Sequence, residues 1–210
     1  MTRTRCVHKL FGLAALIATA SCGDVIRQDR SAVLLVINTL GAQQGNKPGQ
    51  FFSTLNSDVI TNVTTPAPCS PTNPCPTVFG DVGQVVLSLA LKNVGSPSAP
   101  AAPTTNNQVT ITRYHVSYRR ADGRNTPGVD VPYPFDGAST GTVPVTGNLT
   151  LGFELVRIVA KQESPLVQLI TNPAFITTIA DVTFYGQDLV GNQVSVTGSI
   201  QVQFGNFGDF

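Results

Sequence analysis

The sequence predicts an all-β protein, an antiparallel β-sandwich of about seven strands with little helix, and three observations point to this fold class. Apolar residues alternate with polar ones over many short segments, as in strands that bury one face. The connecting segments are rich in Gly, Pro and Asn, which favour turns. Charged residues make up only 12% of the 210 residues, while Thr and Val are abundant.

The first predicted strands lie on either side of a cysteine-containing loop. Residues 32–37 form a continuous apolar run with β-branched side chains, which predicts a buried strand. Residues 41–50 are expected to form a loop, and residues 58–61 a short edge strand. Residues 84–93 alternate cleanly and predict a further strand. Its apolar face is formed by Val85, Leu87, Leu89 and Leu91.

The middle of the chain combines one long strand with irregular segments. Residues 95–107 are rich in Pro, Ala and Ser and predict a connection or surface loop. Residues 109–120 form a long strand whose apolar face changes parity, so we expect a β-bulge near Arg113. After a turn at 122–128, residues 129–137 contain two prolines and should be an edge or irregular segment.

The last strands are predicted from residue 149 onward. Residues 149–159 read as a strand with a parity shift around Leu155. Residues 164–172 are consistent with one helical turn or with a short strand. Residues 176–185 and 194–204 form the final strand pair, and the Gly-Asn-containing segment between them predicts a hairpin connection.

The first 22 residues have the layout of a secretory signal. A positive head with Arg3, Arg5 and Lys9 precedes an apolar run that is shorter than the roughly 20 residues of a membrane span. Thr19-Ala20-Ser21-Cys22 resembles the lipobox of bacterial lipoprotein precursors, although Thr19 stands where that pattern favours Leu. The resemblance implies cleavage before Cys22 and its acylation; the alternative is an ordinary signal peptide that leaves a thiol.

The lipoprotein interpretation divides the chain into a signal peptide at 1–21, a lipid-anchored tether at 22–30 and one sandwich domain at 31–210. Acyl chains contribute about 0.8 kcal/mol per buried methylene, so several chains hold a protein durably at a membrane. Gly23, rather than the Asp that retains some lipoproteins at the inner membrane, follows the cysteine. We therefore expect a cell-envelope protein, anchored at the outer membrane.

Loss of the signal changes the charge and the cysteine count. Ten basic and twelve acidic residues remain, a net charge near −2, which disfavours a nucleic-acid partner. Cys69 and Cys75 are the remaining pair in an oxidising compartment, so a disulfide is expected in the loop near 66–76. Their spacing does not fit a redox CxxC motif, and zinc is disfavoured because no His or second Cys pair accompanies them.

The end of the chain carries a resemblance to known domains. Residues 185–194, YGQDLVGNQV, look like the terminal hairpin of bacterial immunoglobulin-like and fibronectin-III-like surface domains. Residues 119–137 and 182–209 are similar to an uncharacterised group of bacterial secreted lipoproteins. The resemblance implies an immunoglobulin-like sandwich and no particular activity. The paired core cysteines and core Trp of antibody domains are missing, so any kinship is architectural.

Residues suited to catalysis are scarce. His115 is the one histidine after the signal, and it shares a strand face with Arg113 and Ser117. No G-x-S-x-G elbow occurs, and nothing pairs Glu154 or Glu163 with a second carboxylate. Loop oxygens offer weak Ca²⁺ signals, which turn-forming side-chain bonds explain as well. These loop residues are Asp130, Asp136, Asp188 and Asn192. We expect no catalytic residues, no metal and no cofactor.

Arginines alternate with aromatic residues between positions 113 and 135, and both residue types are enriched at protein interfaces. The candidate interaction residues are Arg119, Arg120, Arg124, Tyr133 and Phe135. The alternative is that Tyr114 and Tyr118 belong to the core, the arginines are solvated, and the proline-containing segment covers a sheet edge.

These observations favour a non-catalytic envelope lipoprotein that acts as a surface or periplasmic interaction or structural module, with the membrane and an envelope protein as partners. A carbohydrate- or small-ligand-binding sandwich is the alternative, and a periplasmic enzyme is disfavoured. Exposed Tyr133 and Phe135 flanking a groove would favour a ligand. A deep pocket with His115 beside a carboxylate would favour an enzyme.

Overall fold

The structure is a computed structural model of the whole chain, and it describes residues 30–208. The predicted signal peptide and Cys22 lie outside the described residues. Within 30–208 the chain forms thirteen strands, one short α-helix and two 3-10 helices, which confirms the all-β class with little helix. The elements are β1 (Val33–Gln43), β2 (Thr54–Asp58), β3 (Thr61–Val63), β4 (Cys75–Thr77), β5 (Asp81–Leu91), β6 (Gly95–Ser96), β7 (Ala99–Pro100), η1 (Thr105–Asn107), β8 (Val109–Arg119), β9 (Phe135–Gly137), β10 (Gly141–Val143), β11 (Leu149–Val156), α3 (Ile158–Gln162), η2 (Leu166–Ile170), β12 (Ile176–Asp188) and β13 (Gln193–Gly205).

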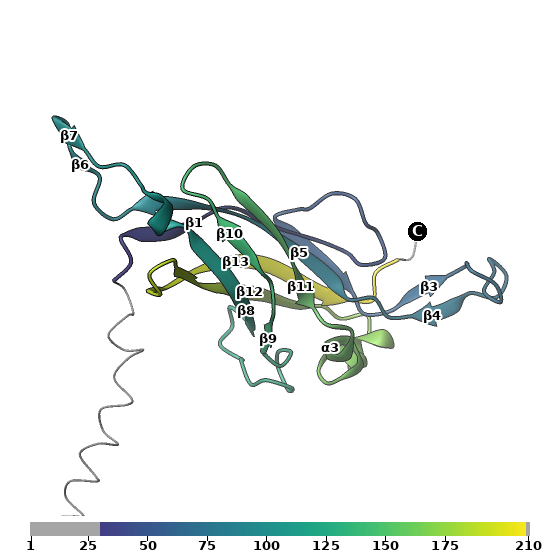
Figure 1. Cartoon of the computed structure of the whole chain (residues 1–210). Helices are drawn as coiled ribbons and strands as arrows, with labels where there is room; N and C mark the ends of the chain where they lie inside the picture. The colour runs from purple at the N-terminus through teal and green to yellow at the C-terminus, as the bar shows by residue number, and fades with distance from the viewer. Residues whose placement is uncertain (1–29, 209–210) are drawn as a thin grey trace, which may run out of the picture.

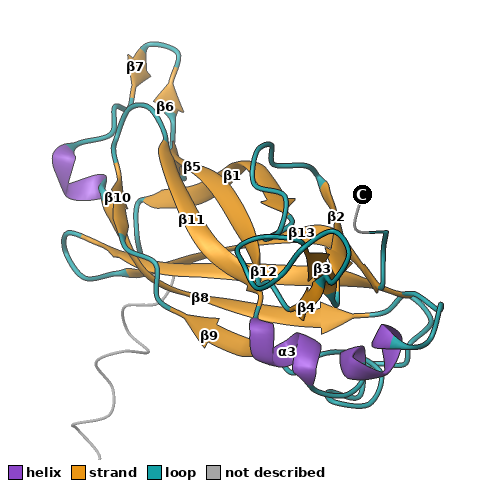
Figure 2. Cartoon of the chain, turned by 90° about the vertical axis from the view of Figure 1, so that its right-hand side faces the viewer, coloured by secondary structure: helices purple, strands orange, loops and turns teal. Residues whose placement is uncertain are grey.

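Two sheets pack face to face as a sandwich (Figure 2). One sheet has three strands in the order β1-β5-β11. The other has six strands: five follow the order β10-β8-β12-β13-β2, and β9 pairs with β8 beside them. These pairs are antiparallel, except that β2 runs parallel to β13. The core between the sheets is one continuous cluster of buried apolar side chains, so strands that are distant in sequence depend on one another.

Aromatic rings connect the two sheets through this core. Phe153 of β11 and Phe184 of β12 have ring centroids 5.3 Å apart at an interplanar angle of 82°, an edge-to-face arrangement that aromatic pairs prefer. Tyr114 of β8 lies 5.4 Å from Phe153. Gly83 of β5 makes room for this cluster, because a Cβ there would lie 2.2 Å from the Phe153 ring.

The sandwich has two distinct ends. The described chain enters at the proximal end, where the Lys92 N–H donates to the Ala32 carbonyl (2.9 Å) beside the β6–β7 hairpin (Figure 1). The β3–β4 hairpin projects from the opposite, distal end (Figure 1), and β8 and β11 run away from the proximal end. β8 has eleven residues, and a strand rises about 3.3 Å per residue, so the two ends lie roughly 33 Å apart.

Both predicted irregularities, at which the apolar side chains of a strand change from odd to even positions, are present. The register of β8 against β12 shifts where Tyr185 pairs with Arg113 and Gly186 pairs with Ile111. The register of β11 against β5 shifts across Leu155. Each shift inserts one extra residue, which restores the inward direction of the apolar side chains that follow it.

The predicted strand at 32–37 needs correction. It extends to Gln43 as β1, which shortens the loop predicted at 41–50. It is also not buried on both faces, because Leu34 is 47% and Val36 37% exposed. The physical reason is that β1 belongs to a sheet whose outer face meets solvent.

Several short elements account for a strand number well above seven. Residues 95–107 contain the β6–β7 hairpin and η1, and the disulfide loop contains β3 and β4. The edge strand expected at 58–61 occurs slightly earlier, as β2 beside β13. Residues 164–172 form the helical turn η2. Residues 129–134 are irregular before the short edge strand β9.

Candidate functional site

The predicted interaction residues lie at the distal end, but one of them is in the core. Arg119 ends β8, while Arg120, Arg124 and Tyr133 lie in the loop that follows. Phe135 is only 7% exposed. The guanidinium of Arg157 lies 4.4 Å above its ring, and the Tyr114 ring packs edge-on against it with centroids 6.3 Å apart. Phe135 therefore supports the loop from beneath and does not belong to the contact surface.

The arginine loop, residues 120–133, is organised around the carboxylate of Asp122. Arg120 donates to it from Nε (3.1 Å) and Nη2 (2.8 Å). Arg124 donates from Nε (3.0 Å) and Nη2 (2.8 Å). Two guanidinium groups thus share one acidic partner and hold a fixed spacing, which is a geometry that arginine forms better than lysine.

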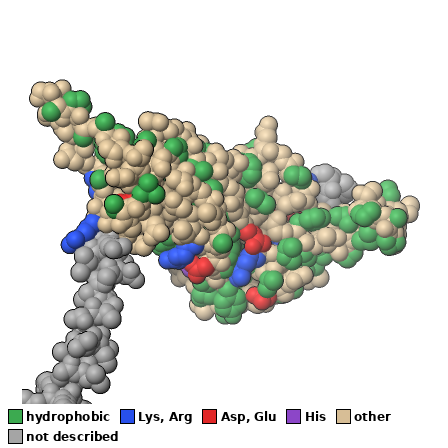
Figure 3. Space-filling view, in the orientation of Figure 1, with side chains coloured by type: hydrophobic (Ala, Val, Ile, Leu, Met, Phe, Trp, Pro, Cys, Tyr) green, Lys and Arg blue, Asp and Glu red, His purple; other side chains and the backbone are tan. Residues whose placement is uncertain are grey.

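The electrostatics of this cluster favour the ionised form of Asp122. Hydrogen bonds from Arg120 and then from Arg124 hold the pKa of the Asp122 carboxyl far below its usual range. The neighbouring Asp130 adds a second negative charge to the loop. The arginine loop is therefore balanced in charge, and Figure 3 shows basic and acidic side chains side by side on an otherwise sparsely charged face.

Backbone hydrogen bonds stiffen the arginine loop. The Arg120 N–H donates to Asn125 Oδ1 (2.6 Å), and the Gly128 N–H donates to the Val131 carbonyl (2.8 Å). Gly128 has a φ of +76°, and a Cβ at this position would lie 2.3 Å from the Tyr133 hydroxyl. Only glycine fits both the backbone and the ring. The ring of Tyr133, which is 51% exposed, thus has a defined position.

A second exposed ion pair lies on the outer face of the six-stranded sheet. Arg119 Nε is 2.6 Å from Asp181 Oδ2, and the Ser199 hydroxyl donates to Asp181 Oδ1 (2.5 Å). Partial burial raises the pKa of Asp181, but the bonds from Arg119 and Ser199 outweigh it and hold the pKa below its usual value. Arg119 is therefore tied to the sheet rather than to the arginine loop.

His115 does have a carboxylate neighbour, in an open setting. Its Nδ1 lies 3.2 Å from Asp136 Oδ1, and the His115 and Asp136 side chains are 33% and 63% exposed. Arg113 approaches the same oxygen (3.3 Å) and lies 3.8 Å above the Tyr185 ring. Solvent reaches all of these groups, so the pair lacks the enclosed surroundings that tune a general base.

Asp188 and Asn192 shape the β12–β13 turn. Asp188 Oδ1 accepts hydrogen bonds from the backbone N–H groups of Val190 (3.1 Å) and Asn192 (2.8 Å). The Asn192 side chain donates to Asp188 Oδ2 (2.9 Å). Burial opposes ionisation of Asp188, but these bonds together hold its pKa below the usual value. The oxygens are thus used by the turn itself.

Sequence reasoning missed a buried ion pair beneath the distal end. Lys161 Nζ lies 2.8 Å from Asp81 Oδ2, and both side chains are 1% exposed. Lys161 also donates to the Asp58 carbonyl (2.7 Å). Asp81 further accepts from the Ser57 hydroxyl (2.6 Å) and the Gly45 N–H (3.0 Å). A lone lysine in a short helical segment carries no sequence signal for this role.

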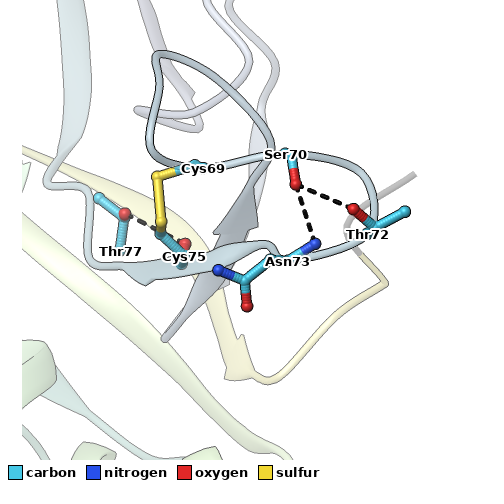
Figure 4. Close-up of a disulfide and its surroundings, with 6 residues drawn as sticks. All are labelled: Cys69, Ser70, Thr72, Asn73, Cys75 and Thr77. Carbon is cyan, nitrogen blue, oxygen red and sulfur yellow. Dashed lines mark hydrogen bonds between the residues drawn. A yellow bond between two sulfur atoms is a disulfide. The ribbon is translucent and has the colours of Figure 1, made fainter.

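The predicted disulfide is present and closes the tip of the β3–β4 hairpin (Figure 4). Cys69 and Cys75 have Cα atoms 5.4 Å apart. Between them, Ser70 and Asn73 exchange two backbone hydrogen bonds of 3.0 Å. Figure 4 shows the Ser70 hydroxyl next to both Thr72 and the Asn73 N–H. The projecting tip is therefore a tight, exposed turn.

A shallow cleft of about 370 Å³ lies beside the chain end at the distal side. Phe175, which is 57% exposed, stacks on Phe207 at the rim of the cleft, with centroids 5.7 Å apart and planes inclined by 9°. The lining residues are Ile170, Thr171, Asn172, Pro173, Asn206, Phe207 and Gly208.

The fold and site define a β-sandwich with a charge-balanced, hydrogen-bonded arginine loop at one end. Comparison with known proteins finds no family model and no curated protein that matches this chain. Between residues 30 and 208, no helix is long and apolar enough to cross a membrane. In the same range, no three His, Cys, Asp or Glu side chains are grouped as metal ligands would be.

Proposed function

We propose that the protein is a non-catalytic module of the bacterial cell envelope, held there by a lipid on Cys22, and that its distal end contacts an envelope protein. The observation that carries this proposal is the position of the first described residues. Residues 30–32 lie at the proximal end, beside Lys92, whereas the disulfide tip projects from the other end and the arginine loop follows the end of β8, below the middle of the sandwich (Figure 1). A tethered sandwich would thus hold both features away from its anchor.

The order of the strands supports an immunoglobulin-like architecture. In that fold, strands A, B and E form one sheet and strands C, F and G the other. Here β1, β5 and β11 correspond to the first set, and β8, β12 and β13 to the second, in the same order. Such domains carry many functions, so the architecture supports a display scaffold and specifies no activity.

Preorganisation of the arginine loop favours protein contacts. Arg and Tyr side chains that are already fixed lose little conformational freedom when a partner binds. Asp122 fixes Arg120 and Arg124, and Gly128 fixes Tyr133. The exposed His115–Asp136 pair gives no comparable support for catalysis.

A second candidate is the binding of a carbohydrate or other small ligand at the distal cleft. The stacked Phe175–Phe207 pair at its rim favours this alternative, because ligand sites combine aromatic surfaces with a few polar groups. Binding to a glycan panel that disappears in Phe175→Ala would establish it. Phe175→Ala should leave partner contacts of the arginine loop intact.

The anchor is tested with the Cys22→Ala variant of the full chain. We expect loss of metabolic acyl labelling and transfer of the protein from the membrane fraction to the soluble fraction. Cys6→Ala is the matched control, because Cys6 lies within the predicted signal peptide and should affect neither readout. Membrane retention of Cys22→Ala would contradict lipid anchoring.

A further inference from the structure

The buried Lys161–Asp81 pair places an amine nitrogen beside a carboxyl carbon. Lys161 Nζ lies 2.8 Å from Asp81 Oδ2. Cγ is bonded to that oxygen at about 1.2 Å, so the nitrogen lies at most about 4 Å from the carbon. Bound groups react when they are held about 3–3.5 Å apart, so a small movement within the pair brings the two atoms into reacting distance. An ion pair of this geometry therefore also contains a nucleophile and its electrophile.

The surroundings of the pair exclude bulk water. Both side chains are 1% exposed, so burial removes the hydration of both charges. Transfer of one proton from the ammonium to the carboxylate converts the two charged groups into an amine and a carboxylic acid, which are less costly to bury. These uncharged forms are the ones that condense to an amide. The same exclusion of bulk water protects an amide from hydrolysis.

Both oxygens of the Asp81 carboxyl accept hydrogen bonds. Oδ1 accepts from the Gly45 N–H (3.0 Å), and Oδ2 accepts from the Ser57 hydroxyl (2.6 Å). A donor at Oδ1 stabilises the negative charge that develops there when an amine attacks the carbon. Glycine is required at position 45, because a Cβ there would lie 1.9 Å from the Gly80 carbonyl oxygen. The close approach of this N–H to the carboxyl is therefore built into the loop after β1.

Lys161 also connects the two points at which the β3–β4 hairpin leaves and re-enters the sandwich. Its Nζ donates to the carbonyl of Asp58 (2.7 Å). Asp58 is the last residue of β2, and Asp81 is the first residue of β5. Residues 59–80 lie between them and include the disulfide tip. The Asp58 carbonyl therefore holds the lysine nitrogen within reach of Asp81, at the base of the projecting hairpin.

We propose that Lys161 and Asp81 condense to an intramolecular amide after the chain folds. Nζ first gives one proton to Oδ2 and then attacks Cγ, which forms the N–C bond and places the negative charge on Oδ1. A second proton passes from Nζ to Oδ2, the Cγ–Oδ2 bond breaks, the Oδ1 carbonyl re-forms and one water leaves. Of the three ammonium protons, two leave in the water and one stays on the amide, so no oxidant or other reactant is consumed.

The amide ties α3 covalently to the base of the projecting hairpin. Its remaining N–H keeps the hydrogen bond to the Asp58 carbonyl, and both buried charges are removed. A cross-link between residues 81 and 161 closes a long loop, and such a constraint favours the folded state by restricting the unfolded chain. This modification goes beyond the proposed function, because it depends on neither the lipid anchor nor a partner protein.

Peptide mapping of the full chain tests the bond directly. The protein purified from cells is unfolded, its disulfide is reduced, its free lysines are acetylated, and it is then digested for mass spectrometry. We expect a branched peptide that contains both Lys161 and Asp81 and is lighter by one water than its two parts together. Lys161 in this peptide should carry no acetyl group. Linear peptides alone, with Lys161 acetylated, would overturn the proposal.

Lys161→Arg provides the second test, because a guanidinium keeps the positive charge but stays protonated and does not condense with the carboxyl. On a reducing, denaturing gel the unsubstituted chain retains a closed loop and should migrate faster than Lys161→Arg. Lys92→Arg, at an exposed lysine, is the matched control and should migrate like the unsubstituted chain. Circular dichroism verifies folding, and if Lys161→Arg does not fold, the peptide map of the unsubstituted chain decides. Equal mobility of all three chains would contradict the bond.

Discussion

Asp122 and Asp81 bind basic side chains in opposite surroundings, and their roles differ accordingly. Asp122 lies on the surface between Arg120 and Arg124, where water screens the charges. Asp81 pairs with Lys161 in the interior, where a charge that loses its partner is costly. The first carboxylate therefore organises a surface, and the second determines stability.

The surface cluster predicts an unusual acid titration. Because Asp122 has a folded-state pKa far below its ordinary value, its carboxylate should remain ionised when the pH falls from 5 to 3. Its contribution to stability is complete above the unfolded pKa of about 3.9, declines as the pH falls below that value, and is fully lost once the pH has fallen through the folded pKa. Carboxyl ¹³C NMR measures this directly. A titration midpoint near pH 3.9 for Asp122 would contradict the hydrogen bonds that Arg120 and Arg124 donate to its carboxylate.

The buried pair predicts a large loss of stability in Lys161→Met. Removing one partner leaves the Asp81 carboxylate buried without a counter-charge, so we expect a loss of about 3–5 kcal/mol in denaturant unfolding. Adding Asp81→Asn removes that charge and should restore part of the loss. Val159→Met, at a half-exposed position of α3, should change stability by less than about 0.5 kcal/mol. A double variant no more stable than Lys161→Met would refute this explanation.

At the scale of elements, the bulge in β11 depends on a tyrosine from the facing sheet. The Tyr118 hydroxyl donates to the Leu155 carbonyl (2.5 Å), where the register shifts. Burial raises the pKa of Tyr118, so this hydroxyl stays protonated and remains a donor. The bond satisfies a carbonyl that the irregular ladder leaves buried.

Tyr118→Phe should therefore destabilise the domain by about 1–3 kcal/mol in chemical unfolding, because the Leu155 carbonyl loses its donor. Tyr133→Phe removes the same atom from a half-exposed ring and should be close to neutral. Equal effects of the two variants would show that the hydroxyl at the bulge has no special role.

The local pattern of the sequence predicts much of these elements. Four local features could be predicted from the sequence, because each depends on residues that are close in the chain. These features are the β-bulges near Arg113 and Leu155, the last hairpin and the disulfide. The burial of Phe135 could not be predicted from the local pattern, because the residues that pack on its ring, Tyr114 and Arg157, are distant in the chain. The Lys161–Asp81 pair could not be predicted either, because its partners are distant in the chain. The solvent-exposed face of β1 could not be predicted, because it depends on the order of the strands in the sheet.

At the scale of the whole molecule, the proposed function depends on the difference between the two ends of the sandwich. The described chain begins at one end of the sandwich, and the arginine loop follows the far end of β8, roughly 33 Å along that strand. A weakly negative domain without a basic excess is suited to contacts of defined shape rather than to attraction of polyanions.

The most direct measurement is site-specific photo-crosslinking of the full chain in intact cells. A photoreactive residue replaces Arg124 at the distal end or, as the control, Val190 in the proximal β12–β13 turn, which is 63% exposed. We expect a discrete protein adduct from position 124 and none from position 190. Absence of an adduct at 124, or the same adducts from both positions, would contradict a distal contact surface.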